Sequence, residues 1–168
     1  DIEFVRGVSV DGAIRTLLIQ SQYLSGDYAG AARELTAEIQ AAEKGGATPA
    51  QDRLNLLLNA ASQLKDPSTT VFALERLVTY YPKREYCVDL LSRMQRKPGF
   101  SDRLVLDTYR LSLATGSMSA AADYMEMGQL ALQAGHEAEA RQVVDKGFAA
   151  NILGQGAEGE RHKRLRDL

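Results

Sequence analysis

The sequence has few of the residues from which catalytic and metal sites are usually built. Its 168 residues include one cysteine, Cys87, and two histidines, His136 and His162. A single cysteine cannot form a disulfide within the chain, and neither histidine has a second ligand at the spacing of a zinc site. We therefore expect no catalytic residue, no metal and no cofactor. Both histidines are expected on the surface, and Cys87 is expected to be buried or to line a groove.

Long apolar runs and an excess of one charge are also missing. No stretch approaches the roughly 18 apolar residues that a membrane-spanning helix needs. The 20 basic and 22 acidic residues nearly balance, whereas a dedicated nucleic-acid-binding domain usually carries a basic excess. The basic clusters at 83–110 and 161–164 are expected to be solvated helix faces. The sequence therefore predicts no membrane span and no nucleic-acid partner.

Helix signals, in contrast, recur along almost the whole chain, and period-two strand patterns are nearly absent. Apolar residues recur at steps of three and four between short turns that are rich in glycine, proline and aspartate. The predicted helices span residues 11–25, 28–44, 48–64, 66–80, 83–96, 101–115, 119–134 and 137–150, with a further helix from 157 onward. Each has one apolar face and must be covered by a neighbour, so the sequence predicts an all-α fold.

Capping residues set the predicted helix starts, because their side chains can accept hydrogen bonds from the free amides of a first turn. The expected caps are Asp11, Asp27, Thr48 followed by Pro49, Asp66 followed by Pro67, Ser101 and Ser119. Within the first helix, the predicted inward side consists of Ile14, Leu17, Leu18 and Leu24.

The turns within successive helix pairs repeat at positions 26, 65, 97 and 135, which are 39, 32 and 38 residues apart. The residues of the last pair that carry a motif are Tyr124, Gly128, Ala131, Gly135, Ala140, Val144 and Phe148. This unit resembles a tetratricopeptide repeat, which has a period of about 34 residues and needs small residues where its two helices approach. The segment 23–31 is similar to the turn region of that motif, and Pro82 falls at its terminal proline.

The resemblance implies a right-handed α-solenoid of stacked antiparallel helix pairs. We expect a single domain over residues 1–168 with pairs at 11–45, 48–82, 83–116 and 119–151 and a truncated helix at 157–168. Both ends of the sequence suggest a fragment of a longer protein. Segments 72–83, 97–103 and 121–127 also resemble uncharacterised proteobacterial tetratricopeptide proteins, many of which are exported. That resemblance favours a periplasmic location, with the cytoplasm as the alternative.

Tetratricopeptide proteins bind ligands on the exposed inner face of the first helix of each pair. The resemblance therefore implies a scaffold that holds a protein or peptide in a concave groove. The matching positions are Gln20, Tyr23, Asn55, Asn59, Gln63, Arg84, Leu91, Met94, Met125, Gln129 and Gln133. Five of these residues are amides on two helices, and side-chain amides can pair with the backbone of an extended peptide.

Two alternatives stay open at this point. The groove positions are equally consistent with the polar faces of ordinary amphipathic helices. The chain as a whole could instead be a structural spacer, or a dimerising segment of a larger envelope protein that has no ligand of its own.

Overall fold

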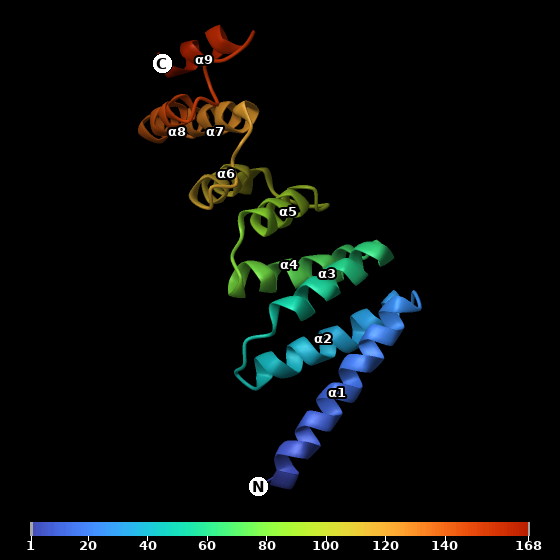
Figure 1. The fold of residues 1–168 in the computed structure, drawn as a ribbon. Helices are drawn as coiled ribbons and strands as arrows, with labels where there is room; N and C mark the ends of the chain where they lie inside the picture. Colours follow the sequence, from blue (N-terminus) through green and yellow to red (C-terminus); the bar gives the residue numbers. More distant parts are fainter. Residues whose placement is uncertain (1, 168) are drawn as a thin grey trace. The chain divides into compact units, whose positions relative to one another are not determined.

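The computed structural model describes the backbone of residues 2–167 and the side chains of residues 12–167. Within this range the protein is all-α and contains no strand, as the sequence predicts (Figure 1). The helices are α1 (Ile2–Leu24), α2 (Tyr28–Lys44), α3 (Gln51–Leu64), α4 (Pro67–Tyr80), α5 (Arg84–Gln95), the 3-10 turn η1 (Asp102–Leu104), α6 (Val105–Ala114), α7 (Ala121–Gln133), α8 (Glu137–Ala149) and α9 (Gly159–Arg166).

The chain divides into two compact units, Asp1–Tyr86 and Cys87–Leu168. In the first unit α1 packs on α2, α2 on α3 and α3 on α4. In the second unit α6 packs on α7, α7 on α8, and α9 on both α7 and α8. From α1 to α4 and from α6 to α9, helices that follow one another in sequence are thus neighbours in space, which is the arrangement that short turns between antiparallel helices produce.

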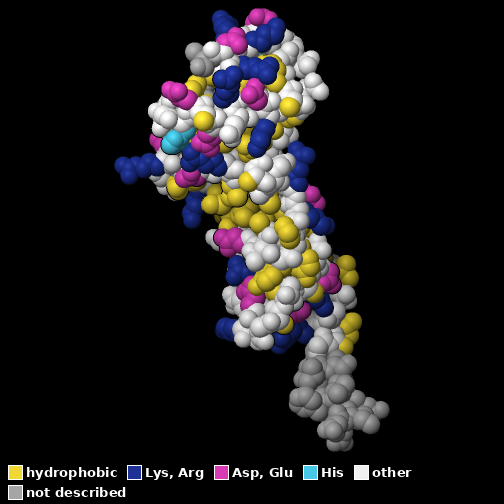
Figure 2. Space-filling model, turned by 90° about the vertical axis from the view of Figure 1, so that its left-hand side faces the viewer, with side chains coloured by type: hydrophobic (Ala, Val, Ile, Leu, Met, Phe, Trp, Pro, Cys, Tyr) yellow, Lys and Arg dark blue, Asp and Glu magenta, His cyan; other side chains and the backbone are white. Residues whose placement is uncertain are grey.

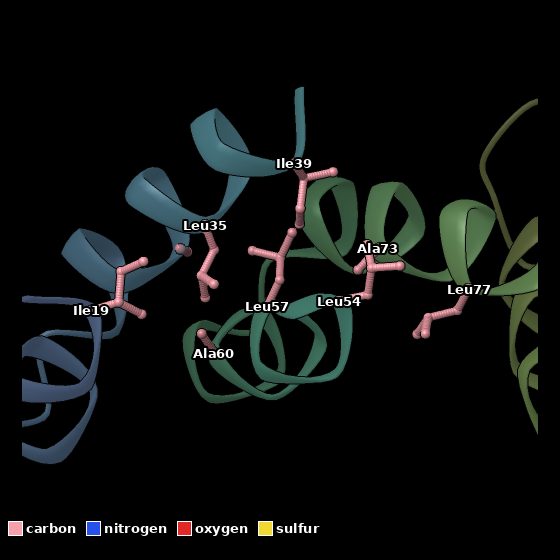
Figure 3. Close-up of a cluster of buried hydrophobic side chains, with 9 residues drawn as sticks. Ile19, Leu35, Ile39, Leu54, Leu57, Ala60, Ala73 and Leu77 are labelled. Atoms are coloured by element: carbon pink, nitrogen blue, oxygen red, sulfur yellow. The ribbon is translucent and has the colours of Figure 1, made fainter. Parts of the chain in front are cut away.

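The core of the first unit joins all four of its complete helices (Figure 3). It consists of Ile19 from α1, Ala32, Leu35 and Ile39 from α2, Leu54, Leu57 and Ala60 from α3, and Ala73 and Leu77 from α4. The predicted helix at 28–44 has one apolar stripe at three- and four-residue steps, and its members Ala31, Ala32, Leu35 and Ile39 are all buried. Burial of such stripes supplies most of the stability of helices this short.

Two of the predicted caps are confirmed by hydrogen bonds. Asp27 precedes α2, and its carboxylate accepts from the Gly30 amide at 2.9 Å. Asp66 precedes α4, accepts from the amides of Ser68 and Thr69, and is followed by Pro67 in the first helical turn. These side chains satisfy amides that have no partner within the helix.

The inward side predicted for the first helix is wrong. Ile14, Leu17, Leu18 and Leu24 are exposed by 59%, 65%, 46% and 85%, whereas Ile19 is fully buried against α2. Ile19 lies on the opposite side of the helix from the predicted stripe, because a residue five positions from Ile14 is rotated by about 140°. Helix α1 therefore has apolar residues on two sides, and its packing on α2 covers only one of them.

Two predicted helix starts are also wrong. Helix α1 begins at Ile2, so Asp11 lies inside it and is not a cap. Helix α3 begins at Gln51 after Ala50, so neither Thr48 nor Pro49 starts it. Pro49 is buried outside the helix, where its carbonyl accepts from the Tyr81 hydroxyl at 2.9 Å, and this tertiary contact delays the start of α3.

The predicted serine caps differ in a similar way. Ser101 precedes the 3-10 turn η1 and makes no side-chain cap, because the Leu104 amide donates to its backbone carbonyl instead. Ser119 lies outside α7, whose N-cap is Ala120 in an extended conformation without a side-chain cap. A helix start without a side-chain cap leaves no signal in the identity of its side chains.

The core of the second unit is rich in methionine and contains Met118, Tyr124, Met125, Met127, Val143, Val144 and Leu153. Gly128 lies where α7 crosses α8, since a Cβ atom on it would be 3.1 Å from Val144 Cγ2 and 4.0 Å from the Ala140 carbonyl. The predicted close approach of the two helices at Gly128 and Ala140 is thus confirmed.

Candidate partner-binding site

A pocket of about 490 Å³ opens on the second unit beside α7 and α9. It is lined by Ala121, Ala122, Met125, Glu126, Gln129, Ile152, Gln155, Ala157, Glu158, Arg161 and His162. Helix α7, the segment 152–158 and α9 thus each contribute part of the wall.

The segment after α8 turns sharply, and this turn places the pocket wall. Asn151 and Gly154 have positive φ angles of 55° and 83°, in the region that favours asparagine and glycine. Between them Leu153 is buried against Gly147 of α8, where a Cβ atom would be only 2.7 Å from Leu153 Cδ1. Gly159 also lies close to Gly154, since a Cβ atom on Gly159 would be 3.0 Å from the Gly154 carbonyl oxygen.

His162 holds α9 to this turn, and its predicted surface position is wrong. The residue is 6% exposed, and its Nδ1 accepts a hydrogen bond from the Gly154 amide at 3.1 Å. The buried imidazole therefore ties α9 to the turn that forms part of the pocket wall.

Helix α9 is also held by an apolar contact and by a charged one. Leu165 packs on the core, with Cδ2 placed 3.2 Å from where a Cβ of Gly128 would be. The Arg166 guanidinium lies over the Phe148 ring at 4.9 Å and donates to Asp145 at 2.8 Å. These contacts pack α9 on both α7 and α8.

The charges around the pocket are unequal. Arg161 pairs with Glu158 at 3.3 Å, so these two residues largely neutralise each other. The side chain of Glu126 is exposed, and its carboxylate makes no ion pair or hydrogen bond with any other described residue. Its charge contributes to raising the pKa of Tyr109, after burial and the charge of Asp123. The pocket therefore carries one carboxylate without a counter-ion.

The eleven predicted groove residues are divided between the two units. Gln20, Tyr23, Asn55, Asn59, Gln63 and Arg84 lie in the first, and Leu91, Met94, Met125, Gln129 and Gln133 lie in the second. Only Met125 and Gln129 line the pocket. Leu91 and Met125 are each 7% exposed, whereas Met94 is 44% exposed.

In the first unit, part of the predicted set serves the packing of helices. The Asn55 side-chain oxygen accepts from the Tyr86 hydroxyl at 3.1 Å, and Tyr23 packs edge-on against Tyr28 at 5.2 Å. Asn59 and Gln63 are exposed on α3, and neither makes a hydrogen bond with the described part of the chain. These two amides are therefore open to an external partner.

The sequence did not identify the other polar residues of the pocket. Gly154 and Gly156 fall between the predicted helices at 137–150 and from 157 onward, but a break there does not reveal that the chain then folds back onto α7. Neither spacing nor charge distinguishes His162 from the basic residues beside it. The sequence pattern does not distinguish Glu126 from any other solvated residue of α7. The juxtaposition depends on tertiary packing by Leu153 and Leu165.

The face drawn in Figure 2 shows basic and acidic side chains interleaved over the part of the chain that contains α7 to α9. Among the described residues no group of three or more histidine, cysteine, aspartate or glutamate side chains could hold a metal ion. No helix in the described range is long and apolar enough to cross a bilayer.

Comparison with known proteins adds no assignment. No model of a known protein family matches the chain, and no curated protein matches its sequence.

Proposed function

We propose that this protein is a binding scaffold for a protein or peptide partner and not an enzyme. In this proposal the helix pairs stack as a right-handed solenoid of the tetratricopeptide type and bind through the exposed faces of first helices. The location that fits an exported relative of this type is the periplasm.

The observation that carries the proposal is a set of free amides on two such helices. Four side-chain amides make no hydrogen bonds with the described part of the chain: those of Asn59 and Gln63 on α3 and those of Gln129 and Gln133 on α7. Side-chain amides donate and accept, so they can pair with the backbone of a bound segment whatever its sequence. Each unit thus carries two such groups on a first helix, and within each unit they favour recognition of an extended chain.

The test is capture of partners from a lysate by the purified chain, followed by mass spectrometry. The double variant Asn59→Ala with Gln129→Ala should lose the captured species. The matched control, Gln40→Ala with Gln142→Ala, removes two exposed amides from the second helices α2 and α8 and should retain them. If both double variants capture the same proteins at unchanged stability, the first-helix faces are not the binding surface.

A second function, that of a dimerising segment or spacer, is favoured by the exposed apolar side of α1. Ile14, Leu17, Leu18 and Leu24 have no cover within the described residues. Light scattering separates the two functions, because a dimerising segment should be dimeric at micromolar concentration. Leu17→Glu should then make it monomeric, whereas a scaffold should keep both its mass and its captured partners.

A further inference from the structure

We propose that the pocket beside α7 and α9 binds a basic side chain of a peptide together with a neighbouring apolar one. This inference rests on the proposed scaffold function and names the chemistry of the segment that the second unit would accept.

The floor of the pocket is suited to an apolar side chain. Met125 is 7% exposed and Ile152 is partly buried, and both face the pocket together with the small residues Ala121, Ala122 and Ala157. Methionine is flexible and polarisable, so it adapts to side chains of different shape. The alanines leave the space that an inserted side chain would occupy.

The charge of the pocket selects a cation. Its ionic lining residues are Glu126, Glu158 and Arg161, and the last two already pair with each other. The carboxylate of Glu126 is therefore the one ionic group of this lining that has no partner among the described residues. A lysine or arginine side chain would complement it, whereas a carboxylate or phosphate would be repelled by Glu126 and would have to draw Arg161 from its exposed pair with Glu158.

The remaining polar groups suit a peptide backbone. The side-chain amides of Gln129 and Gln155 make no hydrogen bonds within the described range, and each amide offers one acceptor oxygen and two donor hydrogens. The lining thus combines apolar side chains, amide donors and acceptors and one carboxylate without a partner, which are the groups that recognition of a basic–apolar dipeptide segment requires.

The experiment uses the full chain and three fluorescein-labelled octapeptides of glycine and serine that differ at two central positions. These positions are lysine–leucine, glutamate–leucine or lysine–serine. Fluorescence polarisation at low salt should give the tightest binding for lysine–leucine. The advantage over glutamate–leucine should shrink at high salt, because exposed charges are then screened.

Two variants test the site itself. Glu126→Gln keeps the shape of the side chain and should weaken lysine–leucine binding about two- to five-fold, the size expected for an exposed ion pair. Ala122→Arg places a cation one helical turn from Glu126 in the same pocket and should weaken it at least as much. The control Glu137→Gln changes an exposed glutamate of α8 outside the pocket and should leave binding unchanged.

The inference is overturned if no peptide binds, if glutamate–leucine binds best, or if Glu126→Gln and Glu137→Gln behave alike. Capture of partners that depends on Asn59 and Gln129 would survive each of these results, so the scaffold proposal stands or fails separately. Circular dichroism melts check that all three variants remain folded.

Discussion

Single residues decide how closely the helices of the second unit approach. At Gly128 the missing side chain leaves room for Val144 from α8 and Leu165 from α9 at the same point. At Gly147 the same device admits Leu153 and the Tyr124 ring, which lie 2.7 and 3.1 Å from where a Cβ would be. Neither glycine has a positive φ angle, so at both positions space, and not backbone conformation, explains why glycine fits.

Replacing Gly128 with leucine should therefore destabilise the second unit by about 1–3 kcal/mol through overpacking. Urea unfolding followed by circular dichroism measures the change. Gln133→Leu is the control, because it introduces the same side chain at an exposed position of the same helix. Equal stability of the two variants would show that α7 and α8 do not cross at Gly128.

The cap of α4 gives a pH-dependent prediction. A hydrogen bond from the Thr69 side chain, followed by one from the Thr69 amide, lowers the pKa of Asp66 below its usual range. A carboxyl group whose folded pKa is lowered stabilises the fold above its unfolded pKa, near 4, and this contribution is lost as pH falls through the folded value.

Asp66→Ala should cost about 1 kcal/mol in the free energy of unfolding at neutral pH. The difference from the unmodified chain should narrow between pH 5 and pH 3, because the unmodified chain then loses the same contribution. Asp66→Asn is the control, since asparagine also caps helices but does not titrate. A gap that stays constant down to pH 3 would mean that the Asp66 charge contributes nothing at this cap.

At the scale of helices, the sequence was sufficient where a helix has one apolar side and insufficient where it has two. The stripe of α2 was predicted correctly because its opposite face is polar. Helix α1 carries Ile14, Leu17 and Leu18 on one side and Ile19 on the other, and periodicity favours the larger set. Only the position of α2 decides that Ile19 is the buried residue.

Ile19→Ala should therefore destabilise the first unit by about 2–5 kcal/mol, as removal of a fully buried side chain does. Leu17→Ala removes a similar number of atoms from an exposed position and should change stability by less than about 0.5 kcal/mol. Thermal unfolding of both variants measures the difference. If Leu17→Ala were instead the more destabilising variant, the buried side of α1 would be the one that the sequence predicted.

The docking of α9 provides a second test among the helices. Leu165→Ala removes the side chain that fills the space over Gly128, and deletion of 157–168 removes the helix entirely. Both should lower the melting temperature of the second unit, the deletion more, because they uncover apolar residues of α7 and α8. Arg164→Ala changes an exposed residue of the same helix and should leave the melting temperature unchanged. If Arg164→Ala lowered the melting temperature as much as Leu165→Ala, charge and not packing would hold α9.

At the scale of the whole chain, the sequence predicted the helix content and most turns, but only Met125 and Gln129 of the pocket. Helix content follows from periodicity and capping, which are local. The pocket requires that residues 152–158 fold back and that α9 pack on α7, and both depend on contacts between residues distant in sequence. Two separate apolar clusters, one around Leu57 and one around Val144, likewise emerge only from packing.

Because each cluster belongs to one unit, a cavity in one should loosen that unit before the other. Leu57 is fully buried in the first unit, and Leu57→Ala should accelerate amide hydrogen exchange in α2, α3 and α4. Exchange in α7 and α8 should stay as in the unmodified chain, while Val144→Ala should give the opposite pattern. This follows if stability is a sum of local terms and neighbour interfaces, as in repeat proteins. Faster exchange throughout both units in either variant would instead show that the 168 residues unfold as one cooperative body.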